Sequence, residues 1–95
     1  MYACVAYDIS SNRTRLRASK WCKKIGLLRL QKSVFAGRAA ADAIAEMEKE
    51  LRPMLLSSDK FVVIPLEKPS FIALIQQSNN ARFQQLREAF VLFDL

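Results

Sequence analysis

The residues best suited to chemistry lie in the first forty positions, where one carboxylate stands among many cations. Asp8 ends an apolar run at 2–7 and is the only acidic residue before position 42. A carboxylate at a strand end can hold a divalent cation beside a phosphate ligand. The alternative is an ordinary turn or helix-start residue, which spacing alone slightly favours.

Basic and aromatic side chains follow Asp8 in the sequence. Within 13–25, a helical period places Arg13, Arg17, Lys20 and Lys24 on one strip, whereas Arg15 fits neither this strip nor the packing face. Such crowding of like charge favours phosphate contact over a solvated face. Ser33 can donate to a phosphate, and Phe35 can stack on a base, although core packing is commoner for phenylalanine. The candidate nucleic-acid contacts are Arg13, Arg15, Arg17, Lys20, Ser33 and Phe35.

The absence of histidine limits the chemistry further. No serine or cysteine has a histidine base, so any hydrolysis would need a carboxylate and a metal-activated water. Cys4 and Cys22 form no CxxC pair, which predicts free buried thiols rather than a zinc site. One Asp8 per chain provides few ligands for Mg²⁺, but a two-fold dimer would supply two such carboxylates. We therefore expect any Mg²⁺ to be shared at the dimer axis, with Asp8 as catalytic and metal residue.

Charge is divided unevenly along the chain. Residues 1–41 carry nine basic side chains and one acid, a net of +8, whereas residues 42–95 carry six basic and eight acidic ones, a net of −2. A positive field confined to one half favours a phosphate-rich partner, duplex DNA or RNA, over a merely solvated basic face.

Hydrophobic periodicity predicts the elements that position these residues. A buried strand is expected at 2–7, a helix at 13–25 capped by Ser11 or Asn12 and ended by Gly26, one bent strand or two short ones at 27–37, a helix at 39–52 ended by Pro53, and a strand at 60–66. The order predicts an α+β ferredoxin-like βαββαβ sandwich, an antiparallel sheet with two helices on one face. Covering the bare face requires a second subunit, which predicts a homodimer.

The chain is short enough for a single domain. We expect a core at 1–68 and a C-terminal extension at 69–95 that contributes to dimer or partner docking. In the extension, Phe83, Leu86, Phe90 and Phe93 recur at helical spacing, while 91–95 alone would also suit an edge strand. Neither a signal peptide nor an apolar run of membrane-spanning length is visible, which predicts no membrane association and a cytoplasmic location.

Several of these features form one pattern. The first strand ends in Tyr7-Asp8-Ile9, an arginine-bearing helix ends at Gly26, and 26–37 reads Gly-Leu-x-Arg-Leu-Gln-Lys-Ser-Val-Phe-x-Gly. This pattern resembles the second CRISPR-associated protein family (Cas-two). The likeness is specific over the first forty residues and extends, by order of elements, over about two thirds of the chain.

The resemblance implies a ferredoxin-like homodimer in which Asp8 is the metal-site residue, surrounded by Arg15, Arg17, Ser33 and Phe35. It also implies metal-dependent endonuclease activity on RNA or DNA, or a bridging role between two CRISPR-associated integrase (Cas-one) dimers during spacer acquisition. The long extension departs from the family pattern. The alternative function is a ribonuclease toxin of the virulence-associated type, which has the same fold.

Overall fold

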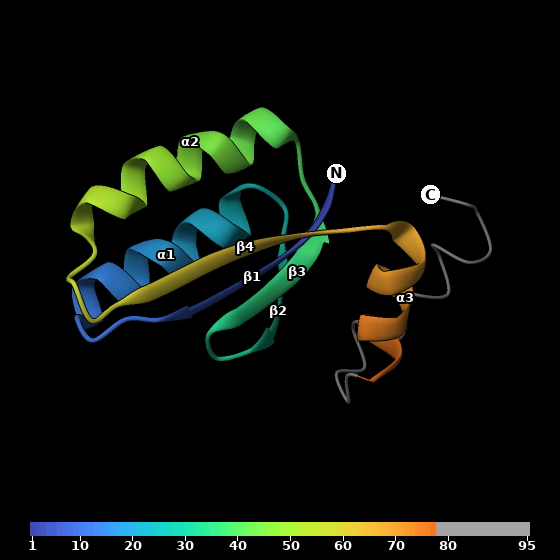
Figure 1. The fold of residues 1–95 in the computed structure, drawn as a ribbon, viewed down its shortest axis with the longest axis horizontal. Coiled ribbons are helices and arrows are strands. Elements are labelled where there is room, and N and C mark those ends of the chain that lie inside the picture. The colour runs from blue at the N-terminus through green and yellow to red at the C-terminus, as the bar shows by residue number, and fades with distance from the viewer. Residues whose placement is uncertain (78–95) are drawn as a thin grey trace.

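The computed structural model describes residues 1–77, in which two helices and a four-stranded sheet form the predicted α+β sandwich. The elements are β1 (Tyr2–Asp8), α1 (Asn12–Lys24), β2 (Leu28–Gln31), β3 (Val34–Arg38), α2 (Ala41–Leu51), the 3₁₀ turn η1 (Arg52–Met54), β4 (Lys60–Leu66) and α3 (Lys68–Gln76). The βαββαβ order is confirmed, and a third helix follows it. Figure 1 shows α1 and α2 side by side over the sheet.

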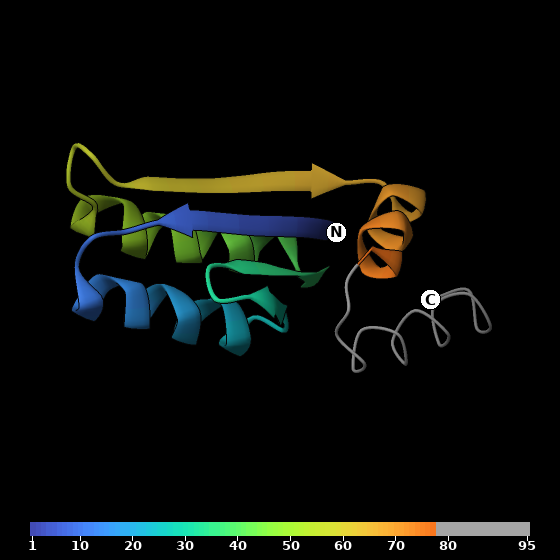
Figure 2. The same cartoon turned by 90° about the horizontal axis from the view of Figure 1, so that it is seen from below.

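The sheet has the strand order β2-β3-β1-β4, and every neighbouring pair is antiparallel. The central strand β1 pairs Val5 with Phe35 of β3 on one side and with Val63 of β4 on the other. Since side chains alternate between faces, the odd-numbered residues of β1 point toward the helices and the even-numbered ones point away. Figure 2 shows the long strands β1 and β4 running alongside the two helices.

Local sequence signals set the bounds of α1. The Ser11 hydroxyl accepts a hydrogen bond from the Thr14 amide at 3.3 Å and caps the first turn. Gly26 follows the last turn with φ +99°, a backbone conformation that side chains with a Cβ rarely adopt. The helix therefore begins at Asn12, one residue before the predicted start, and ends at Lys24.

The segment 27–37 forms two short strands rather than one bent one. A two-residue turn at Lys32 and Ser33 separates β2 from β3, and the pairing shifts register between Arg29 and Gln31. The Ser33 carbonyl accepts a hydrogen bond from the Tyr7 amide at 3.1 Å, which fixes the turn beside the end of β1.

Two hydrophobic cores lie on the two faces of the sheet. The larger core packs the helices onto the sheet through buried side chains that include Val5, Phe35 and Met47. The smaller core lies on the opposite face, where Phe71 and Ile75 of α3 are fully buried. The chain's own helix thus covers part of the face expected to be bare, because an apolar stripe of α3 follows β4 directly.

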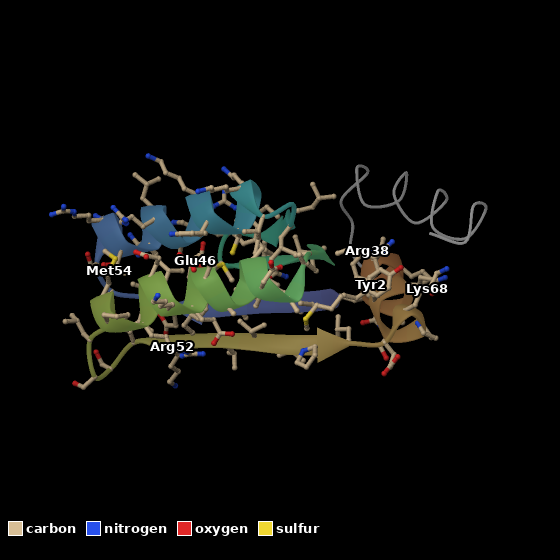
Figure 3. The ribbon with its side chains drawn as sticks, turned by 90° about the horizontal axis from the view of Figure 1, so that it is seen from above. Tyr2, Arg38, Glu46, Arg52, Met54 and Lys68 are labelled. Atoms are coloured by element: carbon tan, nitrogen blue, oxygen red, sulfur yellow. The ribbon has the colours of Figure 1, made fainter. Side chains whose placement is uncertain are left out.

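Tyr2 anchors α3 to the sheet. Its ring stacks on Phe71 with 5.0 Å between centroids, and Figure 3 shows it beside α3. The predicted boundary between residues 68 and 69 falls in the first turn of α3. The remaining expectations for the extension, including Phe83, Leu86, Phe90, Phe93 and a strand at 91–95, lie outside the described residues. Over residues 1–77 the structure contains no helix that is both long and apolar enough to span a membrane.

Candidate nucleic-acid interface

Helix α1 presents an unbalanced positive surface. It carries six basic side chains and no acid. Within residues 1–77 none of these cations forms an ion pair. By contrast, Arg52 of η1 forms an ion pair with Glu48 of α2 at 2.7 Å. Figure 3 shows nitrogen-tipped side chains projecting outward from α1. A field without internal compensation is available to a phosphate-rich partner.

Two of these cations lie at an electrostatically unfavourable end of the helix. Arg13 and Arg15 stand near the N-terminus of α1, and its first turn contains no acid. The positive end of the helix dipole disfavours cations there. A local rule broken in this way is typical of positions kept for function rather than stability.

A pocket of about 240 Å³ opens between α1 and the β2–β3 hairpin. We call it the hairpin pocket. Most of the described residues that line it are basic or carry a hydroxyl group, and none is acidic. They are Tyr7, Asn12, Arg15, Leu16, Ser19, Lys23, Arg29, Lys32 and Ser33. Four cations beside three hydroxyls form a suitable environment for a phosphate group.

Arg29 is held in place within the hairpin pocket. Its Nη2 donates to the Ser19 hydroxyl at 3.0 Å, and its guanidinium carbon lies 5.1 Å from the centroid of the Phe35 ring. It also hydrogen-bonds the Tyr7 hydroxyl. A guanidinium fixed by several contacts needs little reorganisation to bind a phosphate.

The nearby ionisable groups are poor bases and nucleophiles. Burial raises the pKa of Tyr7 above its ordinary value, despite the opposing hydrogen bond from Arg29, so the phenol stays protonated at neutral pH. Burial also raises the pKa of the Cys22 thiol to about 12. That thiol contacts the Met47 sulfur at 4.0 Å in the core, and we assign it a packing role.

Asp8 lies apart from the hairpin pocket. It is exposed at the end of β1, and alternation directs it to the face opposite the helices, while Tyr7 lines the pocket. Its partner in the β1–β4 register is Lys60. In the part of the chain that the structure describes, no group of three or more histidine, cysteine, aspartate or glutamate side chains could hold a metal ion. Asp8 is therefore not part of such a cluster in the described residues.

Asp8 borders an apolar strip that the other described residues leave partly exposed on that face of the sheet. Val62 is 48% exposed and Ile64 is 45% exposed on β4. Their register partners on β1 are Ala6 and Cys4, which are only partly buried. α3 covers the other end of this face, so the strip and Asp8 share the end that residues 1–77 leave open.

The structure separates the predicted contact residues into four places. Arg15 and Ser33 meet in the hairpin pocket, Arg17 and Lys20 line the opposite flank of α1, and exposed Arg13 lines neither site. Phe35 is fully buried and stacks on Tyr7, with centroids 6.3 Å apart. The prediction that Phe35 stacks on a base is therefore corrected, since its core-packing alternative is what the fold provides.

Sequence reasoning missed Ser19, Lys23 and Arg29 as partners of Arg15. A signal was present, because Arg15, Ser19 and Lys23 recur every four residues and form a third stripe on α1. The position of Arg29 follows from the strand register. Arg29 pairs with Phe35 and therefore points to the face of the sheet that the helices cover. That placement needed the strand pairing, which the sequence left open.

Comparison with known proteins agrees with this architecture. Residues 1–72 match the family model of CRISPR associated protein Cas2. The chain is 38% identical over 63 residues to the CRISPR-associated endoribonuclease Cas2 of Korarchaeum cryptofilum, covering 65% of this chain and 68% of that one. Streptococcus pyogenes Cas2 superposes with a TM-score of 0.60 at 27% identity, over 72% of this chain and 88% of that chain. A hypothetical protein from Thermus thermophilus superposes with a TM-score of 0.61 at 27% identity, over 70% and 80%.

Proposed function

The chain belongs to the CRISPR associated protein Cas2 family, and we propose that it is the nucleic-acid-binding component of the CRISPR spacer-acquisition complex, acting as a homodimer beside the Cas-one integrase. Membership of this family favours a CRISPR function over the virulence-associated ribonuclease toxin. The observation that carries the proposal is the cationic surface of α1, which contains no acid of its own and forms no ion pair within residues 1–77.

Phosphate binding is the chemistry that this surface supports best. Arg15 and Arg29 present planar guanidinium groups in the hairpin pocket, and lysines extend the positive field along the helix. Such groups contact the nucleic-acid backbone without reading sequence. We therefore infer that duplex DNA is bound through its phosphates, with RNA as a second substrate.

A second copy of the chain would double this surface. The apolar strip around Val62 and Ile64 lies on the sheet face away from the helices, so covering it with a partner leaves both copies of α1 free for nucleic acid. Two-fold symmetry is the usual way to bury such a strip.

The experiment is a titration of labelled duplex DNA and RNA with purified protein at two salt concentrations, with and without Mg²⁺. The apparent affinity should fall steeply with salt, because each neutralised phosphate contributes about −0.9 to the slope of log K against log salt. The double variant Arg15→Gln, Arg29→Gln should lower that slope, whereas Lys49→Gln on α2 should leave it unchanged. A flat salt response of the unaltered protein would refute the proposal.

A second candidate function is a Mg²⁺-dependent endonuclease. Its support is the exposed carboxylate of Asp8 beside the apolar strip and the name endoribonuclease carried by similar proteins. A metal would be held by Asp8 of two copies, since the described residues of one copy bring no cluster of three such ligands together. Bound Mg²⁺ would supply charge stabilisation and an activated water.

The substitution Asp8→Asn separates the two candidates. If the chain cleaves nucleic acid, the variant should lose cleavage while its affinity for duplex DNA persists. If it serves only as a scaffold, spacer acquisition in cells should continue with Asp8→Asn. Asp42→Asn, an exposed acid on α2, is the matched control for the change in charge.

A further inference from the structure

A second basic pocket, of about 290 Å³, lies on the flank of α1 away from the hairpin pocket. The described residues that line it all come from α1: Arg17, Lys20, Trp21 and Lys24. Their spacing of three, one and three places them on one side of the helix. It holds three cations around the only tryptophan of the chain.

Core packing accounts for only part of Trp21. Its side chain packs against the large core, yet it remains partly exposed and lines the pocket. The Lys24 ammonium lies 4.7 Å from the centroid of the indole ring. The ring therefore offers a π-face that an ion from the solvent side can reach.

A planar base is a better occupant of that face than the lysine. Stacking of a base on an aromatic side chain is generally stronger than an exposed cation–π contact. Lys24 has a flexible stem and would remain within reach of a neighbouring phosphate after leaving the ring. The chemistry is that of a stacking platform bordered by phosphate-binding cations.

We propose that this pocket is a subsite for an unpaired nucleotide of a single-stranded nucleic acid, whose base stacks on Trp21 while the flanking phosphates contact Arg17, Lys20 and Lys24. The inference rests on the proposed nucleic-acid binding and names a substrate class for it. Paired bases are stacked inside a duplex and cannot reach a ring on the helix surface. The subsite thus discriminates unpaired from paired strands, which phosphate contacts alone do not do.

The single tryptophan allows a direct test by intrinsic fluorescence. The protein is titrated with an oligothymidylate, with an abasic phosphodiester strand of equal length and with a hairpin duplex, and anisotropy of labelled strands follows binding independently. The oligothymidylate should quench Trp21 strongly, and the abasic strand should bind with little quenching. Equal quenching by both strands would overturn the subsite.

Variants at Trp21 provide the second arm. Trp21→Leu should weaken binding of the oligothymidylate by about five- to a hundredfold, the range for losing one stacked base, whereas Trp21→Phe should retain most of the affinity. Duplex affinity should stay within about twofold in both variants, which also verifies that the fold is intact. An equal loss for single strand and duplex overturns the inference.

Failure of the subsite and failure of the proposed function would give different results. If the unaltered protein binds duplex DNA in a salt-dependent way but Trp21 neither responds to single strands nor contributes to their affinity, the subsite is wrong and the proposed function stands. If neither nucleic acid binds at any salt concentration, both fall.

Discussion

Asp59 fastens two loops at the end of the sheet where Asp8 lies. Its carboxylate accepts hydrogen bonds from the Ser10 amide and hydroxyl, both at 3.1 Å, and from the Leu56 amide at 2.9 Å. These bonds hold the pKa of Asp59 below its ordinary value, and the bond from the Leu56 amide contributes most. The loop that leads from Asp8 into α1 is thereby tied to the start of β4.

Replacing Asp59 with asparagine should destabilise the protein in a pH-dependent way. Because the folded pKa is lower than the unfolded one, the carboxylate contributes stability above its unfolded pKa, and that contribution disappears as pH falls through the folded pKa. Thermal melting should therefore give a lower Tm for Asp59→Asn than for the unaltered protein at neutral pH, and the two Tm values should converge as the pH falls below the folded pKa. Glu50→Gln, an exposed change on α2, serves as control. A difference in Tm that stays constant across this range would contradict the assignment.

Helices α1 and α3 illustrate two uses of a helix in this fold. α1 buries only Thr14, Ala18, Ser19 and Cys22 and leaves its cations in solvent, which serves binding. α3 buries Phe71 and Ile75 against the sheet, which serves stability. For α3, the small core makes each buried ring energetically important.

Truncation of Phe71 tests the structural role of α3. The change Phe71→Ala removes a fully buried ring and should lower the free energy of unfolding by about 3 to 5 kcal/mol, measured by urea denaturation. Ala73→Ser, on the exposed side of the same helix, should change it by about 0.5 kcal/mol or less. If Phe71→Ala melts α3 alone while hydrogen exchange of β1 and β3 is unaltered, α3 is not part of the cooperative core.

The molecule as a whole has two faces with different chemistry. Helices α1 and α2 form one layer over the sheet (Figures 1 and 2), and α1 carries the positive surface. The opposite face of the sheet exposes the apolar strip beside Asp8. Nucleic acid and a second copy can then bind without competing. This separation is the basis for expecting a dimer that binds polyphosphate.

A charge placed in the apolar strip should break that dimer. Ile64→Asp would bury an unpaired carboxylate in each half of the interface, so the dimer should weaken by about a hundredfold or more, as followed by sedimentation velocity. The monomer should remain folded by circular dichroism, since Ile64 is 45% exposed. Leu56→Asp, at a loop position that is 58% exposed, should leave the dimer unaffected. A chain that sediments as a monomer at every concentration would refute the two-copy arrangement.

The sequence by itself determined the order of the core elements as far as β4, apart from the choice between one strand and two at 27–37, because periodicity, the cap at Ser11 and the stop at Gly26 act over only a few residues. It also determined the positive charge of α1, since a helix of known phase fixes which side chains share a stripe. Only the tertiary structure decided that Asp8 faces away from Arg15, that Phe35 is enclosed in the core, and that Arg29 completes the hairpin pocket. Each of these depends on strand register, where a shift of one residue exchanges the two faces, and register is set by pairing between segments distant in the chain.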